Sequence, residues 1–504
     1  MSMPAEHLPT KPNLAELLQG IADAPPLPLN DIASDSRALK PGDLFLACGG
    51  ERGHGLDYAA DAVTAGVAAI AWDSATAEAP TSELGVPMIA VPGLSQHLGE
   101  LANRFYAHPS AAMRVVGITG TNGKTTVAWL IAQCFERLGR TCGYVGTLGS
   151  GIGAVENAEC LTTPDTVALH RQIAQFRDAT AECAAIEVSS HALAQDRVAG
   201  IAFDTVLFTN LSRDHLDYHG NMQSYAAAKA RLFLDCNAKH RIINLDSDFG
   251  MQLAGQCGQD VVTVSTNFDR VANGRPFVFV RSVVANGNGS QVRISSCWGD
   301  GDFELPMPGD FNVANAVIVL ALLLQHGVPM QQACDVLATV SAPPGRMQRV
   351  VAAGKLPAVF IDYAHTPAAI DVALRALRAH CKGSLWCVFG CGGDRDAGKR
   401  PQMGKIAEHR ANRLVVTSDN PRSEKPTEIT AQIVAGLERP NRVTVLEDRA
   451  AAIAWAIREA RTDDVVLIAG KGHESYQLLG GQRLNFSDYG AALANLAARA
   501  EAGE

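Results

Sequence analysis

Short apolar runs alternate along most of the chain with segments whose apolar residues recur at helical spacing. In the middle of the chain, the run from Arg114 to Thr119 predicts a buried strand, and the next segment carries its apolar residues on one helical face. That face consists of Val127, Leu130, Ile131, Cys134 and Leu138. Strands and helices continue to alternate to about Val340, which predicts a mainly parallel, doubly wound sheet.

Two breaks interrupt this alternation. Before the segment Ala107-His108-Pro109-Ser110, which is typical of a linker, short apolar runs and turn signals predict a small α/β unit. After Ala342-Pro343-Pro344-Gly345 the alternation restarts, with strands predicted at Ala358 to Ile361, Leu385 to Phe389, Arg413 to Thr417 and Val465 to Ala469. We therefore expect an α/β protein with three domains, at residues 1–110, 111–343 and 344–504.

Composition narrows the class of protein. A chain of 504 residues with 47% hydrophobic and 19% charged residues is typical of a globular protein with two to four domains. Its net charge of -9 argues against a general nucleic-acid binder, although a local basic pocket could still bind phosphate. The most apolar run, Ala316 to Leu324, is shorter than the roughly 20 residues of a membrane span. The N-terminus shows no signal-peptide core, so we expect a cytoplasmic protein without membrane insertion.

The twelve cysteines are scattered and include no CxxC pair. Cys387 and Cys391 have no second Cys/His pair downstream that would complete a zinc site. We therefore expect the cysteines to be small buried side chains in a reducing compartment.

The strongest chemical signal is the segment from Gly117 to Thr126, between the predicted strand and helix. It departs from G-x-x-x-x-G-K-[ST], because Ile118 stands where the first glycine is expected. Gly120 and Gly123 still allow backbone N–H groups to surround phosphate oxygens at the N-terminus of the helix. Lys124 supplies a positive charge, and the Thr125 hydroxyl can bind magnesium. ATP use by a kinase, ATPase or ligase is expected, and a turn without nucleotide is the alternative.

The loop Gly120-Thr121-Asn122-Gly123-Lys124-Thr125-Thr126 resembles the ATP loop of the Mur ligases and of their relative, folylpolyglutamate synthetase. The resemblance continues through Glu187-Val188-Ser189-Ser190-His191, through Thr209 to Gly220, and through Tyr225-Ala226-Ala227-Ala228-Lys229. It implies that Lys124, Glu187, His215 and Lys229 are catalytic. Thr125, Glu187 and His215 would bind magnesium, and Lys229 would be carbamylated. An ordinary surface Glu187 and a solvated Lys229 remain alternatives.

Further matches lie downstream. Phe311-Asn312-Val313-Ala314-Asn315, Pro344-Gly345-Arg346-Met347 and Asp362-Tyr363-Ala364-His365-Thr366-Pro367 resemble segments that contact ATP in Mur ligases. They add Asn312, Arg346 and Asp362 to the expected ATP contacts. The resemblance implies the three-domain Mur ligase architecture, with a central P-loop-type doubly wound parallel sheet and a C-terminal Rossmann-like domain. It also implies ATP-dependent, magnesium-dependent amide ligation through an acyl phosphate.

The expected nucleotide-linked substrate is UDP-N-acetylmuramoyl-L-alanyl-D-glutamate, a peptidoglycan precursor. Ser34-Asp35-Ser36-Arg37 and Glu51-Arg52-Gly53 resemble its UDP-binding end, and Thr162-Thr163-Pro164 resembles the segment that contacts its muramoyl peptide. The implied contacts are Ser34, Ser36, Glu51, Arg52, Gly53, Thr162, Thr163, Ser189, Gln195 and Arg197. Ser36 as the simple cap of a turn remains the alternative.

The expected amine is meso-2,6-diaminopimelate, because Asp419-Asn420-Pro421-Arg422 resembles the diaminopimelate-recognition motif of Mur ligases. The Arg422 guanidinium can pair with the distal carboxylate that lysine lacks. The implied contacts are Arg395, Asp419, Asn420, Pro421, Arg422, Gly470 and Glu474. A lysine-adding Mur ligase, folylpolyglutamate synthetase and a noncatalytic nucleotide sensor are the rival functions. We expect a monomer that binds no nucleic acid.

Overall fold

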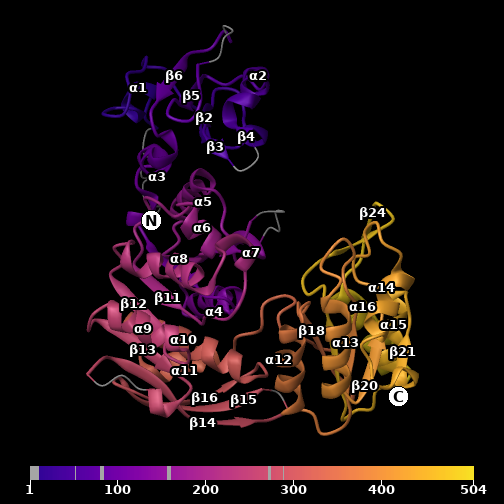
Figure 1. Ribbon diagram of the computed structural model, residues 1–504. Coiled ribbons are helices and arrows are strands. Elements are labelled where there is room, and N and C mark those ends of the chain that lie inside the picture. Colours follow the sequence, from indigo (N-terminus) through magenta and orange to yellow (C-terminus); the bar gives the residue numbers. More distant parts are fainter. Residues whose placement is uncertain are drawn as a thin grey trace. The chain divides into compact units, whose positions relative to one another are not determined.

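The computed structural model describes residues 11–50, 53–79, 84–155, 161–270, 274–287 and 289–503. The chain divides into two compact units, one of residues 1–263 and 272–276 and the other of residues 264–271 and 277–504. Figure 1 shows their helices and strands along the sequence.

The first unit begins with a small parallel sheet in the order β1-β2-β5-β6. Its strands are β1 (Ile32–Ala33), β2 (Leu44–Ala47), β5 (Ala69–Asp73) and β6 (Met88–Val91). The accompanying elements are α1 (Leu14–Leu17), the hairpin strands β3 (Gly49–Gly50) and β4 (Gly53–His54), α2 (Ala59–Thr64) and α3 (Leu94–Phe105). Successive β2 residues enter two different apolar clusters, as expected for a strand that is buried on both faces. The predicted α/β unit at the N-terminus is therefore confirmed.

The rest of the first unit is built on strands in the order β13-β12-β11-β7-β10-β8-β9. Pairing is parallel from β12 through β8, and β9 is antiparallel to β8. The strands are β7 (Arg114–Thr119), β8 (Cys142–Gly146), β9 (Gly149–Ile152), β10 (Cys183–Glu187), β11 (Thr205–Phe208), β12 (His240–Asn244) and β13 (Val261–Ser265). The helices are α4 (Lys124–Arg137), α5 (Thr166–Asp178), α6 (Ser190–Ala194), α7 (Leu216–His219), α8 (Met222–Leu234) and α9 (Asp248–Gln256). The predicted parallel, strand–helix arrangement is confirmed here.

The second unit departs from that alternation in its first part. Strands β14 (Phe277–Ala285), β15 (Ser290–Ser296) and β16 (Gly299–Leu305) follow one another as an antiparallel meander. Short turns make this possible, because Asn286 and Gly289 bond to each other across one turn and Gly299 has a φ of +112° at the other. The alternation expected to Val340 therefore stops earlier. Helices α10 (Asp310–Gln325) and α11 (Met330–Leu337) follow, and α10 contains the predicted buried run.

The last part of the second unit is a sheet in the order β17-β18-β22-β19-β20-β21, parallel except for β17. Its strands are β17 (Gln348–Val350), β18 (Ala358–Asp362), β19 (Leu385–Phe389), β20 (Arg413–Val416), β21 (Val443–Val445) and β22 (Val465–Ala469). Its helices are α12 (Pro367–Arg378), α13 (Lys399–Arg410), α14 (Pro426–Val434), α15 (Arg449–Glu459) and α16 (Asp488–Glu501). The hairpin of β23 (Tyr476–Leu479) and β24 (Gln482–Asn485) precedes α16.

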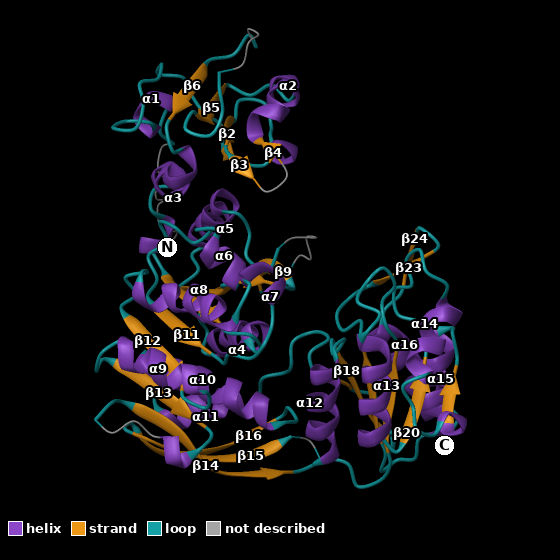
Figure 2. Cartoon of the chain, viewed as in Figure 1, coloured by secondary structure: helices purple, strands orange, loops and turns teal. Residues whose placement is uncertain are grey.

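Two apolar clusters place this last sheet between helices, as Figure 2 shows. One cluster joins the sheet to α12, α13 and α14, and the other joins it to α15 and α16. Both faces of the parallel strands are thus covered, and their polar chemistry is left to the loops at the strand ends.

The cysteines among the described residues are all free, and Cys160 lies outside those residues. Most of the described cysteines are buried or half-buried as expected, but Cys297 is exposed. No helix of the described residues is long and apolar enough to cross a membrane.

Candidate active site

The phosphate loop connects β7 to α4 and is held against the residues that follow β11. The Thr121 N–H donates to the Asn210 carbonyl oxygen at 2.8 Å, and the Asn122 N–H donates to Asn210 Oδ1 at 3.0 Å. Gly120 is required at its position because a Cβ there would lie 1.9 Å from Thr209 Oγ1. Gly123 has a φ of +89° and caps α4, whose first-turn N–H groups lack partners within the helix. The loop therefore has the geometry of an anion site.

Glu187 is completely buried at the carboxyl end of β10. Its Oε2 accepts hydrogen bonds from Thr125 Oγ1 at 2.9 Å and from Thr147 Oγ1 at 3.1 Å. Its Oε1 accepts hydrogen bonds from the Tyr144 hydroxyl at 2.6 Å and from the Thr147 N–H at 2.9 Å. The interpretation of Glu187 as a surface charge is therefore wrong. The carboxylate is instead held beside the first turn of α4.

Two lysines meet at the carbonyl oxygen of Gly120. Lys124 Nζ and Lys229 Nζ each donate to that oxygen at 2.8 Å, and Lys124 Nζ also donates to the Thr121 carbonyl oxygen at 3.0 Å. Lys229 is 1% exposed, so the interpretation of it as a solvated lysine is wrong. Burial, reinforced by the positive charge of Lys124, holds the pKa of Lys229 well below its usual value.

Histidine rings gather beside this loop. The ring centroid of His191 lies 4.9 Å from that of His215 and 5.5 Å from that of His219. Burial comes first among the causes that lower the pKa values of His191 and His219, followed by the charge of His215. His215 itself has a φ of +52° and precedes α7, with its side chain 45% exposed. Its exposed ring is available to an external ligand.

Most of the residues predicted to contact the muramoyl peptide form one network around Glu187. Thr163 Oγ1 donates to the Glu187 carbonyl oxygen at 2.7 Å and accepts from the Ser189 N–H at 3.0 Å. Arg197 Nη1 donates to the Thr163 carbonyl oxygen at 3.0 Å, and its other Nη contacts Gln195. Thr162 joins this network because its hydroxyl lies 3.2 Å from the Thr147 hydroxyl.

Only some of the residues predicted to bind the UDP end of the substrate belong to the described part of the chain. Ser34 Oγ donates to Asp165 Oδ1 at 3.0 Å, which ties the N-terminal sheet to the start of α5. Ser36 begins a 3-10 turn that is capped by Asp35 rather than by Ser36, so the interpretation of Ser36 as the cap is wrong. Gly53 starts β4, whereas Glu51 and Arg52 lie outside the described residues.

The three remaining predicted ATP contacts lie in the second unit. Asp362 accepts hydrogen bonds from the Met347 and Ala364 N–H groups, both at 2.8 Å, and its burial raises its pKa. Arg346 stacks on Tyr363, with its guanidinium carbon 4.6 Å from the ring centroid. Its buried Nε has no hydrogen-bond partner within the described residues, as expected of a group that awaits an anionic ligand. Asn312 is a buried residue of α10 whose Nδ2 donates to the Pro308 carbonyl oxygen.

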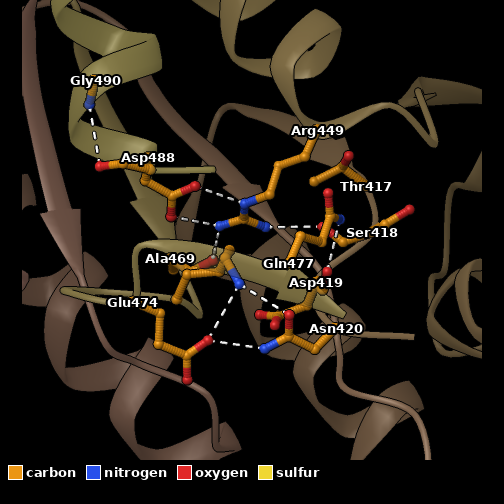
Figure 3. Close-up of polar contacts among 12 residues, drawn as sticks. Thr417, Ser418, Asp419, Asn420, Arg449, Ala469, Glu474, Gln477, Asp488 and Gly490 are labelled. Atoms are coloured by element: carbon orange, nitrogen blue, oxygen red, sulfur yellow. Dashed lines mark hydrogen bonds and ion pairs between the residues drawn. The ribbon is translucent and has the colours of Figure 1, made fainter. Parts of the chain in front are cut away.

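Most of the residues predicted to bind the amine follow β20 or β22 in the chain. Figure 3 shows three of them, Asp419, Asn420 and Glu474, side by side. Asn420 Nδ2 donates to Glu474 Oε2 at 2.8 Å. Gly470 has a φ of +118°, and a Cβ there would lie 2.4 Å from Asp419 Oδ2, so glycine leaves room for this carboxylate. Burial raises the pKa of Asp419, although Arg449 and Lys471 oppose that shift. A carboxylate pair of this kind suits an ammonium group.

Arg422 follows Pro421 in the same loop and has a φ of +53°. Its Nη1 donates to the Gly393 carbonyl oxygen at 2.7 Å, while its N–H donates to the Leu478 carbonyl oxygen at 3.1 Å. Arg395 approaches the same place, because a Cβ on Gly392 would lie 2.9 Å from Arg422 Nη1 and 3.7 Å from Arg395 Cγ. The structure thus brings the Arg422 guanidinium and the Arg395 side-chain stem beside Gly392.

Sequence reasoning missed several residues of these networks. Tyr144 lies in the middle of buried strand β8, where its spacing gives no sign that it meets Glu187. Lys471 stands directly after Gly470. A charged residue this close to the end of a buried strand could have been recognised in the sequence as a candidate site residue. Arg449 and Asp488 form a fully buried ion pair with an Nε–Oδ1 distance of 2.7 Å. Because Arg449 and Asp488 are 39 residues apart, the sequence gives no sign that they form a pair.

Magnesium fits the oxygen donors beside the phosphate loop. The described residues contain no group of three or more histidine, cysteine or acidic side chains that could hold a metal ion. Thr125 and Glu187 nevertheless place a hydroxyl and a carboxylate 2.9 Å apart. Mg²⁺ typically binds one or two carboxylates and completes its shell with water and substrate phosphates. The donor set therefore suits a magnesium ion that is bound together with a nucleotide.

Three models of the Mur ligase family match most of the chain. Residues 29–106 match the Mur ligase family catalytic domain, residues 118–323 the Mur ligase middle domain, and residues 345–472 the Mur ligase glutamate ligase domain. Together with the relatives below, these matches show that the chain belongs to the Mur ligase family of enzymes.

The similar relatives are UDP-N-acetylmuramoyl-L-alanyl-D-glutamate–2,6-diaminopimelate ligases. The Pseudomonas aeruginosa protein of that name is 46% identical over 93% of this chain and 95% of its own length. The Chromobacterium violaceum protein is 44% identical over 92% of this chain and 93% of its own length. A solved structure of a protein with the same name is 32% identical, covers 97% of this chain and 100% of its own, and has a TM-score of 0.71.

More distant structures share the fold alone. Mycobacterium tuberculosis folylpolyglutamate synthase, solved with ADP and AMPPCP, is 20% identical with a TM-score of 0.59. It covers 79% of this chain and 94% of its own.

Proposed function

We propose that the chain uses ATP to join meso-2,6-diaminopimelate to UDP-N-acetylmuramoyl-L-alanyl-D-glutamate during peptidoglycan precursor synthesis. One observation carries the proposal: Arg422 and the pair Asn420–Glu474 belong to the same group of loops at one end of the last sheet. A guanidinium and a carboxylate suit the two ends of a diamino diacid. The relatives named for this reaction support the assignment.

The proposed reaction proceeds through an acyl phosphate. The substrate carboxylate attacks the γ-phosphorus of ATP, and ADP leaves. The amine then attacks the acyl carbon, the phosphate group departs with the bonding electrons, and the nitrogen loses a proton. Lys124 and the N–H groups at the start of α4 stabilise the phosphate charge, which requires Lys124 Nζ to leave its present carbonyl partners. Bound magnesium, held by Thr125, Glu187 and His215, would neutralise phosphate charge.

Carbamylation of Lys229 is part of the proposal. Its lowered pKa favours the neutral amine, which can attack carbon dioxide and release one proton to form a carbamate. The product is an anion beside the phosphate loop, where it can help to hold magnesium.

Selection of the amine is assigned to the C-terminal loops. Arg422 and Arg395 would bind the distal carboxylate of diaminopimelate, and Glu474 would bind an ammonium group. Lysine lacks that carboxylate and would leave a guanidinium without its partner, which costs binding free energy. Asp419, Asn420, Pro421 and Gly470 complete the proposed contacts.

The remaining assignments follow from the same proposal. Residues 1–110 would bind the UDP end, 111–343 would bind ATP, and 344–504 would bind the amine. Ser34, Ser36 and Gly53, with Glu51 and Arg52, are assigned to the UDP end. Thr162, Thr163, Ser189, Gln195 and Arg197 are assigned to the muramoyl peptide. We further propose that the protein works as a cytoplasmic monomer.

Phosphate release tests the proposed function. We expect release only when ATP, the UDP-dipeptide and meso-diaminopimelate are all present, with diaminopimelate strongly preferred to lysine. Mass spectrometry should identify the UDP-tripeptide product. Equal release without either acceptor would contradict ligation, and equal use of lysine would contradict the assigned amine.

A further inference from the structure

The amine site contains a lysine that no assignment so far uses. Lys471 is completely buried, directly after Gly470 at the end of β22. Its Nζ lies 3.0 Å from Asn420 Oδ1 and 3.1 Å from Glu474 Oε2. It also lies 5.5 Å from the centroid of the Tyr476 ring. The ammonium group therefore contacts two residues that are proposed to bind the amine.

These contacts determine the orientation of the Asn420 side chain. Its Oδ1 accepts from both Lys471 Nζ and the Leu478 N–H, the latter at 2.9 Å. With its oxygen turned to these donors, the amide directs Nδ2 to Glu474 Oε2 at 2.8 Å. Glu474 Oε2 thus receives two donors from the protein, whereas Oε1 receives none in the contacts of the described residues. Oε1 is the oxygen left for a substrate ammonium.

The balance of charges around Lys471 also supports a role in amine binding. Asp419, Glu474 and Asp488 carry three carboxylates, and Lys471 and Arg449 carry two cations. The carboxylates outnumber the cations, so the cluster suits an incoming ammonium group. Without Lys471 the carboxylates of this cluster would lose one of their two cationic neighbours, which is unfavourable where they are buried.

We propose that Lys471 is a positioning residue for amine binding, which orients Asn420 and Glu474 and sets the charge of the site. It acts through these two side chains rather than by touching the substrate. The inference rests on the proposed function, because it takes diaminopimelate as the amine.

Substitution of Lys471 tests this role in the full-length protein. We expect Lys471→Met to raise the KM for meso-diaminopimelate at least tenfold, equivalent to about 1.4 kcal/mol, with the KM for ATP unchanged. Lys471→Arg keeps the charge but cannot place its nitrogen at the same point, so a smaller rise of about threefold is expected. Arg483→Met is the matched control, because Arg483 also lies over Tyr476, with its guanidinium carbon 4.1 Å from the ring centroid. It should leave both KM values unchanged.

A double substitution separates positioning from a general loss of stability. In a Glu474→Gln background, Lys471 keeps only its contact with Asn420, so Lys471→Met should raise the KM for diaminopimelate by a smaller factor than it does in the wild-type protein. Non-additivity of this kind is expected for side chains in direct contact. If Lys471→Met does not fold by itself, Lys471→Arg and the double variant still decide the question.

The pH profile provides a readout that a merely structural lysine would not move. Asp419 is faced by Arg449 of α15, by Lys471 and Glu474 after β22, and by Asp488 of α16. Tyr363 and His365 after β18 and Cys391 after β19 also interact with it. Lys471 lowers the pKa of Asp419, so its removal should raise that pKa further. The acid limb of kcat/KM for diaminopimelate should then move to higher pH in Lys471→Met and stay in place in Lys471→Arg.

These experiments distinguish a failure of the positioning role from a failure of the proposed function. If the wild-type protein does not ligate diaminopimelate, the function itself is wrong. If it does, an unchanged KM for diaminopimelate in folded Lys471 variants would overturn the positioning role alone. An equal change in the wild-type and Glu474→Gln backgrounds would overturn it as well.

Discussion

Lys229 and Lys124 show how environment alters a side chain at the residue scale. Both ammonium groups point at one carbonyl oxygen of Gly120, and Lys229 has almost no exposure to water. Desolvation and the neighbouring cation both disfavour its charged form. An ordinary lysine within α8 thus becomes a candidate nucleophile toward carbon dioxide.

We predict that Lys229 is carbamylated in the active protein. With ¹³C-labelled bicarbonate, a carbamate resonance should appear in the wild-type NMR spectrum and be absent from Lys229→Ala. That variant should lose activity by about a hundredfold, because the anion beside the phosphate loop is missing. Lys239→Ala is the control, since Lys239 is 74% exposed. A spectrum that is identical in the wild-type protein and Lys229→Ala would contradict the modification.

We also predict that Arg422 determines the choice of amine. Arg422→Lys keeps a positive charge but loses the planar pair of donors that matches a carboxylate. The kcat/KM for meso-diaminopimelate should fall more than tenfold, or about 1.4 kcal/mol, while that for lysine changes little. Lys425→Met, at an exposed cation in the following segment, should leave both values unchanged. A parallel loss for both amines would argue against recognition of the distal carboxylate.

At the scale of elements, the phosphate loop depends on its neighbour as much as on its own residues. Residues Thr121 and Asn122 are bonded to Asn210, and Gly120 packs on Thr209, both of which follow β11. Strand β11 is parallel to β7, and the carboxyl ends of the two strands therefore lie side by side. The conformation of the loop is set by this pairing together with the start of α4.

Gly120→Ala tests that dependence. The new Cβ would lie 1.9 Å from Thr209 Oγ1, so the loop has to shift. We expect ATP affinity, measured by calorimetry, to fall at least tenfold.

Gly139→Ala provides the control for backbone strain alone. Gly139 has a φ of +73° with no atom within 4 Å of the added Cβ. The Gly139→Ala substitution should lower the free energy of unfolding by about 1 kcal/mol and leave ATP affinity unchanged. Equal ATP affinity in Gly120→Ala and the wild-type protein would contradict close packing of the loop.

At the scale of the whole molecule, the proposed chemistry is shared between two units. The phosphate loop lies in the first unit, whereas Asn312, Arg346, Asp362 and the amine residues lie in the second. Each of the two units contains an apolar core of its own. Transfer of a phosphoryl group to an acceptor and then to an amine requires their reactive groups to meet.

We therefore predict that ligands compact the molecule. Small-angle scattering should give a smaller radius of gyration with a nonhydrolysable ATP analogue, magnesium and the UDP-dipeptide than without ligands. The Arg346→Ala variant should show a weaker response, because its guanidinium is proposed to meet the nucleotide. Identical scattering curves with and without ligands would contradict closure.

Particular residues show how far the sequence could be interpreted. Strands β7, β19 and β22 begin and end where their apolar runs predict, since a buried parallel strand needs a continuous apolar segment. The antiparallel meander of β14, β15 and β16 was missed. The apolar run of β14 does not by itself distinguish antiparallel from parallel pairing, and β16 contains mostly polar residues and glycines. Lys124, Glu187 and Arg422 were found as candidates because their motifs are short and contiguous.

What the sequence by itself determined is therefore local: the phosphate loop between a strand and a helix, the order of the motifs, and the buried strands of both large sheets. Only the tertiary structure decided that Glu187 meets Tyr144, that Lys229 is buried beside Lys124, and that Lys471 joins Asn420 to Glu474. The reason is physical. Burial, hydrogen bonding and pKa depend on side chains that are distant in sequence and adjacent only after folding.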